Sequence, residues 1–494
     1  MEKREKGDSY SHILKYTSLF GGVQGLNILV SVVRTKLVAM ILGPDGMGLV
    51  SLFNSTIKLV SDSTNLGLPM SAVKNVSEAF DSGSPLRVQR AVGLVRLWEL
   101  LTALLGMAVC ILFSPLLDRW TFDWGDHTLH FVLLSPVVGL LAVTGGEAAI
   151  LKGMRQLRAL AAVSVCNIVL ALLCSVPIYY FFGQAGIVPS LVLLALIQCV
   201  ATVACSYRLC RPAFRFSRSR LREGGSMVSL GLAFVAAGVL GSGAEFLVRS
   251  YLNTTGDLAV VGLYNAGFVM TMTYAGMVFS AMETDYFPRL SGIAHCGPRL
   301  NEMVNHQTEV LLLLVSPMLV FFMVALPVLL PLLYSGKFMP VLGMVQLTVL
   351  AMYLRAMTLP VEYIALSRSD SRSYLLLEAV YDVAFVVLVI VGYRWLGLVG
   401  TGAGLVAAGV LNLAVVYGYA HGRYGYRVAP SVRRYALLQI PLGVAAYGVT
   451  LFVHGPAYWA AGLLLGGVAL AVSVKILHGK ANLWAALMRK IRRR

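Results

Sequence analysis

Charged residues interrupt the long apolar stretches of this 494-residue chain. Arg34 and Lys36 lie in one apolar run, and Lys58 and Asp62 lie in the next. A charge at the centre of a bilayer costs roughly 2.5–3.5 kcal/mol on insertion scales, so such side chains are expected to face protein or water. Guanidinium and ammonium groups in this setting indicate a watery cavity that receives an anion.

Four cations carry this interpretation. Lys58 and Asp62 are four residues apart, as are Glu245 and Arg249, and this spacing places each pair on one helix face. Each pair either lowers the cost of insertion by neutralisation or belongs to a binding site, and the sequence leaves both open. Arg355 lies seven residues before Glu362, again on one face. The predicted substrate-binding residues are Arg34, Lys58, Arg249 and Arg355.

Acidic residues in the same runs are candidates for ion coupling or gating, because a carboxyl withdrawn from water can take up a proton near neutral pH. These candidates are Asp62, Glu245, Glu283 and Glu362. Glu283 belongs to a charged helix end that is either a gate or simply solvated. Arg96 and Glu99 are interpreted as a local pair.

The elements that must position these residues are membrane-spanning helices. The chain is 58% hydrophobic and 13% charged, with a mean hydropathy of +0.77, whereas soluble domains are about 25% charged. A spanning helix needs roughly 20 apolar residues. An all-α polytopic fold is therefore predicted, with about fourteen spans at residues 16–42, 48–70, 91–114, 129–151, 157–182, 186–207, 226–252, 259–287, 308–334, 340–366, 373–395, 398–420, 434–453 and 457–477.

The basic residues are concentrated in alternate loops between these spans. With a cytoplasmic N-terminus, 31 of the 40 Lys and Arg fall in cytoplasmic segments or at the span ends next to them, three in the opposite loops and six deeper inside spans. This positive-inside pattern predicts that both termini are cytoplasmic. It also accounts for the net charge of +17, so nucleic acid is not an expected partner.

An internal repeat is predicted from two similar segments. One begins at Gly48 and the other at Gly262, about 214 residues later. Two six-helix lobes with parallel topology would place a site between them. The predicted domains are an N-lobe (1–207), a basic cytoplasmic linker (208–225), a C-lobe (226–420), and a last part (421–494) with two more spans and a basic tail.

Enzyme chemistry has no recognisable basis in the sequence. The metalloprotease, nucleotide-binding and hydrolase motifs are absent from it, and its seven cysteines form no C-x-x-C pair. The expectation is a protein that is not an enzyme and that uses no cofactor or metal.

The segments VVRTKLVAMILGPDGMG and LGLPMSAVKNVSEA, together with the repeat and the span number, resemble the multidrug/oligosaccharidyl-lipid/polysaccharide (MOP) superfamily. The closest likeness is to the O-antigen or capsule repeat-unit flippases of the Wzx type. The resemblance implies two lobes in a V shape that alternate in access. Val33, Arg34, Val38, Ala39 and Gly43 match a first-helix pattern of the related lipid II flippases, which implies a cavity role for Arg34. The arginine pair of their second helix is absent, and Lys58 supplies charge nearby.

The resulting hypothesis is a monomeric flippase of the bacterial inner membrane. It would move an undecaprenyl-diphosphate-linked oligosaccharide from the cytoplasmic to the periplasmic leaflet, with membrane lipid as its surroundings and H⁺ or Na⁺ as candidate coupling ions. The alternatives are a cation-coupled drug or metabolite antiporter of the same fold and a lipid II-type flippase. A membrane-embedded sugar polymerase or ligase is disfavoured by the short outer loops, and a scaffold by the six cations inside spans.

Overall fold

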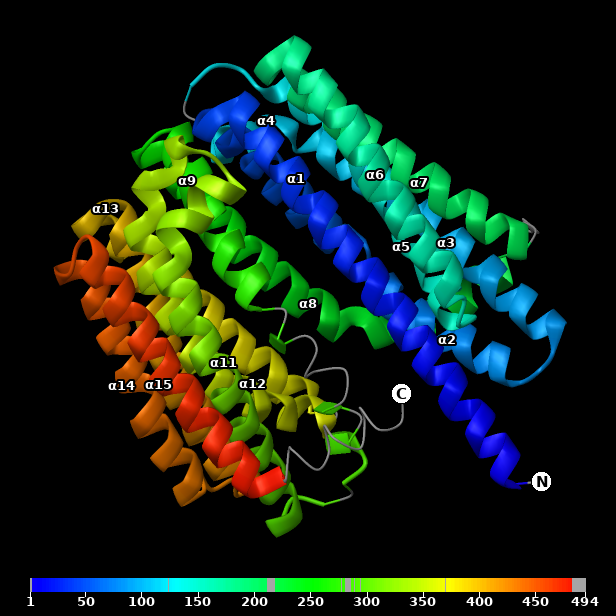
Figure 1. Ribbon diagram of the computed structural model, residues 1–494. Helices are drawn as coiled ribbons and strands as arrows, with labels where there is room; N and C mark the ends of the chain where they lie inside the picture. Colours follow the sequence, from blue (N-terminus) through cyan, green and yellow to red (C-terminus); the bar gives the residue numbers. More distant parts are fainter. Residues whose placement is uncertain are drawn as a thin grey trace. The chain divides into compact units, whose positions relative to one another are not determined.

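The computed structural model describes residues 2–122, 124–210, 218–276, 278–279, 286–287, 289–293, 295–368 and 370–481. Every regular element in these ranges is a helix, which confirms the predicted all-α fold (Figure 1). Among the described residues, nine helices are long and apolar enough to cross a membrane. Each of the fourteen predicted spans overlaps a described helix.

The number of helices and the number of predicted spans differ because some helices run through two spans. Helix α1 (Glu2–Thr64) covers the first two spans and is broken at Gly43, whose φ is 66°. Pro44 follows, where a proline is tolerated because the first turn of a helix needs no intrahelical N–H bond. Helix α13 (Ser371–Tyr424) is broken in the same way at Gly397, with φ 58°. Glycine suits both breaks because a positive φ strains other residues.

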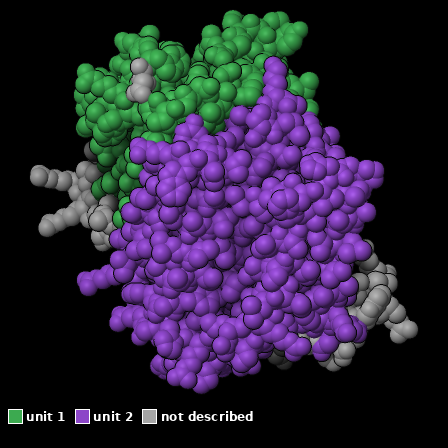
Figure 2. All heavy atoms as spheres, turned by 90° about the vertical axis from the view of Figure 1, so that its left-hand side faces the viewer, with its two compact units in different colours: residues 1–262, 333–335 green, residues 263–332, 336–494 purple. Residues whose placement is uncertain are grey.

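The chain divides into two compact units (Figure 2). Unit 1 comprises Met1–Gly262 and Leu333–Ser335, and unit 2 comprises Leu263–Leu332 and Gly336–Arg494. Helix α9 (Leu258–Val269) runs through the boundary at Gly262. The predicted lobe boundaries stay a prediction.

Unit 1 contains α1 to α8. Helices α5, α6 and α7 lie side by side (Figure 1), and α1 packs against α6 and α8. The helices of this unit after α1 are α2 (Leu68–Asp81), α3 (Pro85–Leu112), α4 (Ser114–Thr121), α5 (Thr128–Gly153), α6 (Leu157–Phe182), α7 (Ile187–Leu209) and α8 (Arg218–Thr255).

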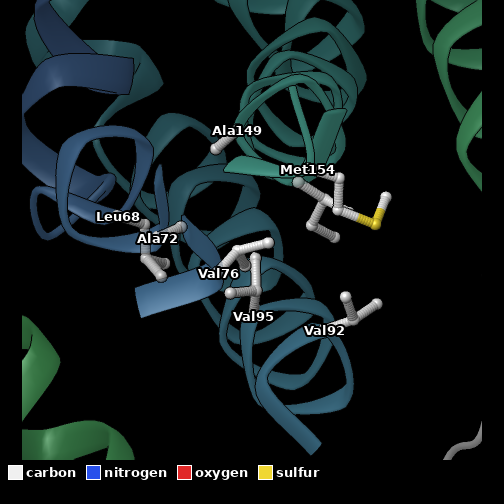
Figure 3. Close-up of a cluster of buried hydrophobic side chains, with 8 residues drawn as sticks. Leu68, Ala72, Val76, Val92, Val95, Ala149 and Met154 are labelled. Atoms are coloured by element: carbon white, nitrogen blue, oxygen red, sulfur yellow. The ribbon is translucent and has the colours of Figure 1, made fainter. Parts of the chain in front are cut away.

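An apolar cluster joins α2, α3 and α5 (Figure 3). Val76 and Val95 are fully buried there, and Met154 closes the cluster just beyond the end of α5. Where lipid surrounds the helices, close packing of such side chains and not transfer from water holds them together. The cluster therefore fixes the two spans that also carry Arg96 and Glu147.

Unit 2 is built around α12 (Leu342–Ser367). This helix packs along α13 and also contacts α14 (Pro430–Phe452), which packs on α15 (Pro456–Ala481). The remaining long helix, α11 (Pro298–Leu333), receives hydrogen bonds from two buried tyrosines. Tyr353 Oη donates to the Ser316 carbonyl at 3.1 Å, and Tyr458 Oη donates to the Val324 carbonyl at 2.9 Å.

Asp370, in the turn after α12, caps the N-terminus of α13. Its carboxylate accepts hydrogen bonds from the backbone N–H and the hydroxyl of Ser373 at 3.2 and 2.7 Å. The hydroxyl bond is the main reason why the pKa of Asp370 lies below its usual range. A charged aspartate at this position also suits the positive N-terminal end of α13.

Candidate functional site

A cavity of about 300 Å³ lies inside unit 1, bounded by both parts of α1 and by α5, α6 and α7. Helix α1 contributes to this lining on both sides of its break, because the break at Gly43 folds the second part of α1 back beside the first. The residues that line this cavity, called the unit 1 cavity below, are Arg34, Thr35, Val38, Met47, Val50, Asn54, Ile57, Val137, Leu141, Tyr179, Leu191, Leu194, Ala195 and Gln198.

Arg34 is the single charged residue among the described residues of this lining. Its Nε donates to Ser175 Oγ at 3.0 Å, and the Ser175 hydroxyl donates in turn to the Ala171 carbonyl at 2.6 Å. Within the described ranges Arg34 has no carboxylate within ion-pair distance. Its guanidinium is therefore oriented by a neutral group and keeps its full positive charge toward the cavity.

Lys58 and Arg249 have a different environment, because both bind the same carboxylate. Lys58 Nζ lies 3.1 Å from Glu245 Oε1, and Arg249 Nη1 lies 3.0 Å from Glu245 Oε2. Arg249 Nε also donates to Ser51 Oγ at 3.0 Å. These bonds join the second part of α1 to α8 inside unit 1. The predicted Glu245–Arg249 pair is present, but Lys58 pairs with Glu245 and not with Asp62.

Asp62 lies near Lys58, Ser242 and Glu245. The four ionisable groups Lys58, Asp62, Glu245 and Arg249 therefore sum to zero charge when all are ionised. This network is half-exposed at Lys58 and buried at Arg249. It supports helix packing in this conformation, and it offers an anion much less net charge than Arg34 does.

A second cavity, of about 240 Å³, lies inside unit 2 between α12 and α13. It is called the unit 2 cavity below. It brings together the predicted residues Arg355 and Glu362 with Glu378, which belongs to the next helix. The full lining is Met272, Ala351, Met352, Arg355, Thr358, Leu359, Glu362, Tyr363, Leu366, Tyr374, Leu377, Glu378, Tyr381, Leu405, Gly409 and Asn412.

The polar groups of the unit 2 cavity are partly fixed. Asn412 Nδ2 donates to Glu362 Oε1 at 2.8 Å, which bridges α13 to α12. Arg355 is exposed, and its charge acts on both Glu362 and Glu378 without an ion pair to either within the described part of the chain. With one guanidinium and two carboxylates, this cavity has the opposite charge balance to the unit 1 cavity.

Sequence reasoning was wrong about Arg96. It pairs with Glu147 on α5, not with its near neighbour Glu99, through Nε–Oε1 at 2.7 Å and Nη2–Oε2 at 3.2 Å. Arg96 also donates to the Cys210 carbonyl and lies 4.2 Å from the centre of the Tyr207 ring. The lone acid Glu147 in an apolar run was the available signal. By contrast, Ser175 and Asn412 carry no charge that would single them out in the sequence.

Glu283 lies outside the described residues. The binding and coupling roles of the other seven predicted residues stay predictions. The structure groups them as Arg34 in the unit 1 cavity, Arg355 and Glu362 in the unit 2 cavity, and Lys58, Asp62, Glu245 and Arg249 between α1 and α8.

Long apolar helices that surround charged internal cavities define a multi-pass membrane protein. The particular family follows from comparison with known sequences. A model of the family described as polysaccharide biosynthesis protein matches residues 37–342, which is more than half of the chain, so the chain belongs to this family. A search of curated proteins finds no match.

Solved structures share the fold at low identity, and some of them are transporters of the MOP superfamily that the sequence resembles. The lipid II flippase MurJ in an inward closed conformation has 10% identity and a TM-score of 0.66, covering 94% of this chain and 99% of its own. An inward-facing multidrug resistance MATE family transporter of the MOP superfamily has 15% identity and a TM-score of 0.63, covering 83% and 96%. A MOP superfamily transporter from Pyrococcus furiosus has 17% identity and a TM-score of 0.53, covering 82% and 93%.

Proposed function

We propose that this protein is a flippase for an anionic lipid-linked oligosaccharide, of which an undecaprenyl diphosphate carrier is the expected form. The supporting observation is Arg34, which faces the unit 1 cavity and has no acidic partner among the described residues. Withdrawing a diphosphate from water is costly unless a cation binds it, and a guanidinium can donate two parallel hydrogen bonds to phosphate oxygens. Membership of a polysaccharide biosynthesis family supports a sugar-bearing cargo.

The direction of transport follows from the charge of the cargo. An inside-negative potential favours outward movement of an anion by about 2.3 kcal/mol per charge per 100 mV. We infer movement from the cytoplasmic to the periplasmic leaflet of a bacterial inner membrane, by a monomer with both termini in the cytoplasm. The two predicted six-helix lobes would alternate in access. H⁺ and Na⁺ remain the candidate coupling ions, with Asp62, Glu245, Glu283 and Glu362 as the proposed acids.

The test replaces Arg34 by Gln and by Lys in vesicles that carry a fluorescent polyprenyl-diphosphate sugar. Loss of a charge-assisted hydrogen bond costs about 1.5–3 kcal/mol, so Arg34→Gln is expected to reduce flipping roughly ten- to hundredfold. Arg34→Lys should retain part of the rate, because it keeps the charge but loses the planar fork.

Lys36→Gln is the matched control. It removes a positive charge two residues from Arg34, and the Lys36 side chain is not named in the cavity lining. Its flipping rate should stay close to that of the unmodified protein. Normal flipping by Arg34→Gln, at equal protein levels, would contradict the proposal.

An antiporter of cationic compounds is the second candidate, and the acid excess of the unit 2 cavity favours it. Efflux of a cationic dye that is lost in both Asp62→Asn and Glu362→Gln would support this function. A lipid II-type flippase would also use Arg34, and competition between lipid II and the oligosaccharide carrier distinguishes the two cargoes.

A further inference from the structure

We propose that the unit 2 cavity binds one uncharged or amino-bearing sugar ring of the cargo. This inference rests on the proposed function and assigns a sugar site to α12 and α13. Its elements are three tyrosines, Tyr363, Tyr374 and Tyr381, together with two carboxylates, one guanidinium and one amide. This combination of flat rings and hydrogen-bonding groups matches the two kinds of surface that a sugar presents.

The polar groups match the hydroxyls of a sugar. Each hydroxyl both donates and accepts, so it needs donors and acceptors at close spacing. Glu362 and Glu378 accept, Arg355 donates, and Asn412 does both. The 2.8 Å bond from Asn412 to Glu362 holds two of these groups in place before a ligand arrives. A partly preformed site loses less entropy on binding.

The tyrosine rings match the C–H face of a sugar. Tyr374 and Tyr381 lie seven residues apart on α13, which places them on one side of that helix. The Tyr381 ring is also nearly parallel to that of Phe385, with an interplanar angle of 20° and centroids 6.3 Å apart. This contact helps to fix a flat apolar surface next to the carboxylates, where a pyranose ring can pack.

Charge and size restrict the ligand further. Two carboxylates against one guanidinium leave the lining with a net negative charge, so a uronic acid or a diphosphate is disfavoured. A cavity of about 240 Å³ is at the lower end of ligand pockets, which measure roughly 300–1,000 Å³. It therefore fits one ring and excludes a whole oligosaccharide.

The experiment is saturation-transfer NMR on the full-length protein in lipid nanodiscs. The probes are methyl glucoside, N-acetylglucosamine, glucosamine and methyl glucuronide, each at millimolar concentration, with NaCl or KCl as the salt. Saturation transfer to at least one of the first three sugars is expected, and the glucuronide should bind at least about tenfold more weakly than that sugar.

Three variants place the signal in the cavity. Tyr381→Leu and Asn412→Leu should weaken sugar binding at least about tenfold, whereas Tyr381→Phe should retain it because the ring remains. Tyr180→Leu is the matched control, because this tyrosine is 72% exposed on α6 in unit 1. Circular dichroism and the melting temperature verify that each variant is folded.

The inference is overturned if none of the sugars gives saturation transfer, if the glucuronide binds most tightly, or if only Na⁺ shifts the melting temperature. It is also overturned if folded Tyr381→Leu and Asn412→Leu bind sugar normally. The outcome is separate from that for the proposed function, because Arg34→Gln should leave sugar binding in unit 2 unchanged. Sugar binding without diphosphate flipping would preserve this site and reject the flippase.

Discussion

Arg96 and Glu147 form a buried ion pair in unit 1, with exposed fractions of 2% and 0%. Burial of charge is costly unless every donor and acceptor is used. Arg96 uses its fork on the Glu147 carboxylate and its remaining groups on Ser206 and the Cys210 carbonyl, so α3, α5 and α7 are joined at one point. Glu99, also buried, contributes a second carboxyl to the same cluster.

Replacing Arg96 by Leu should destabilise the protein strongly, because two buried carboxyls lose their cation. Removing one partner of a buried pair costs about 3–5 kcal/mol. The measurement is the thermal unfolding of the detergent-solubilised protein, followed by fluorescence-detected size exclusion.

The matched control for Arg96→Leu is Arg155→Leu, which breaks a 2.8 Å pair with Asp81 whose side chains are 64% and 53% exposed. An exposed pair is worth about 0–1 kcal/mol. Equal loss of stability in the two variants would contradict the structural role of Arg96.

At this scale the sequence predicts which residues are unusual but not their partners. Arg34, Glu245 and Arg355 stand out because they are charged within apolar runs. The spacing of Arg96 and Glu99 favoured a local pair, but the acid that binds Arg96 lies 51 residues away. Sequence spacing describes one helix, whereas Glu147 meets Arg96 only after α3 packs on α5.

At the scale of elements, glycines determine where helices break and where they touch. Gly48 on α1 and Gly262 on α9 meet at a close backbone crossing. A Cβ at Gly48 would collide with the Leu258 carbonyl oxygen, and a Cβ at Gly262 would collide with that of Pro44. The two glycines are also the first residues of the predicted repeat, so the same requirement for a small residue applies in both copies.

Gly48→Ala should therefore destabilise unit 1, because a backbone carbonyl cannot rotate away as a side chain can. Overpacking typically costs about 1–3 kcal/mol. The measurement is the melting temperature of the purified protein in one detergent.

Gly238→Ala and Gly418→Ala are the controls for Gly48→Ala, because a Cβ at either position meets no atom within 4 Å. In a helix these controls should be neutral or stabilising by up to about 1 kcal/mol. A Gly48→Ala protein as stable as the two controls would show that the crossing tolerates a methyl group.

Hydrophobicity predicted the elements well, because a spanning helix must satisfy its backbone internally whatever its neighbours are. The break at Gly43 was also visible, since Gly-Pro-Asp-Gly combines a permissive residue with a proline. The structure places the second helix earlier than the predicted start at residue 48, because Pro44 already adopts helical geometry. Apolar periodicity does not detect a proline in the first turn.

At the scale of the whole molecule, the distribution of basic residues predicts its orientation in the membrane. We expect an impermeant maleimide to label Asp126→Cys and Arg394→Cys from outside intact spheroplasts. Ser82→Cys and Ser291→Cys should react only after the membrane is permeabilised. All four positions are exposed, and each variant is made in a protein without its seven native cysteines.

Permeabilised spheroplasts provide the control for this labelling, since all four cysteines should then react. Labelling of Ser82→Cys in intact spheroplasts, with Asp126→Cys protected, would reverse the predicted topology. Mixed labelling on both sides would contradict the even number of spans.

The sequence predicted the fold class and family but not the two internal cavities. The alternation of apolar runs and basic loops is a property of the whole chain, so it is visible without coordinates. Which side chains line a space depends on how helices rotate when they pack. Lys58 illustrates this, because its spacing predicted a pair with Asp62 on the same helix, whereas it binds Glu245 on α8 beside Arg249.

The hydroxyl of Ser175 has a consequence for how the proposed cargo could be released. An arginine paired with a carboxylate changes its affinity for an anion when that acid is protonated. An alcohol does not ionise at physiological pH, so it has no such effect. The affinity of the unit 1 cavity for an anion would then be the same in acidic and alkaline surroundings. Acidification alone should not discharge the cargo, and a proton gradient would have to act through the carboxyls elsewhere in the chain.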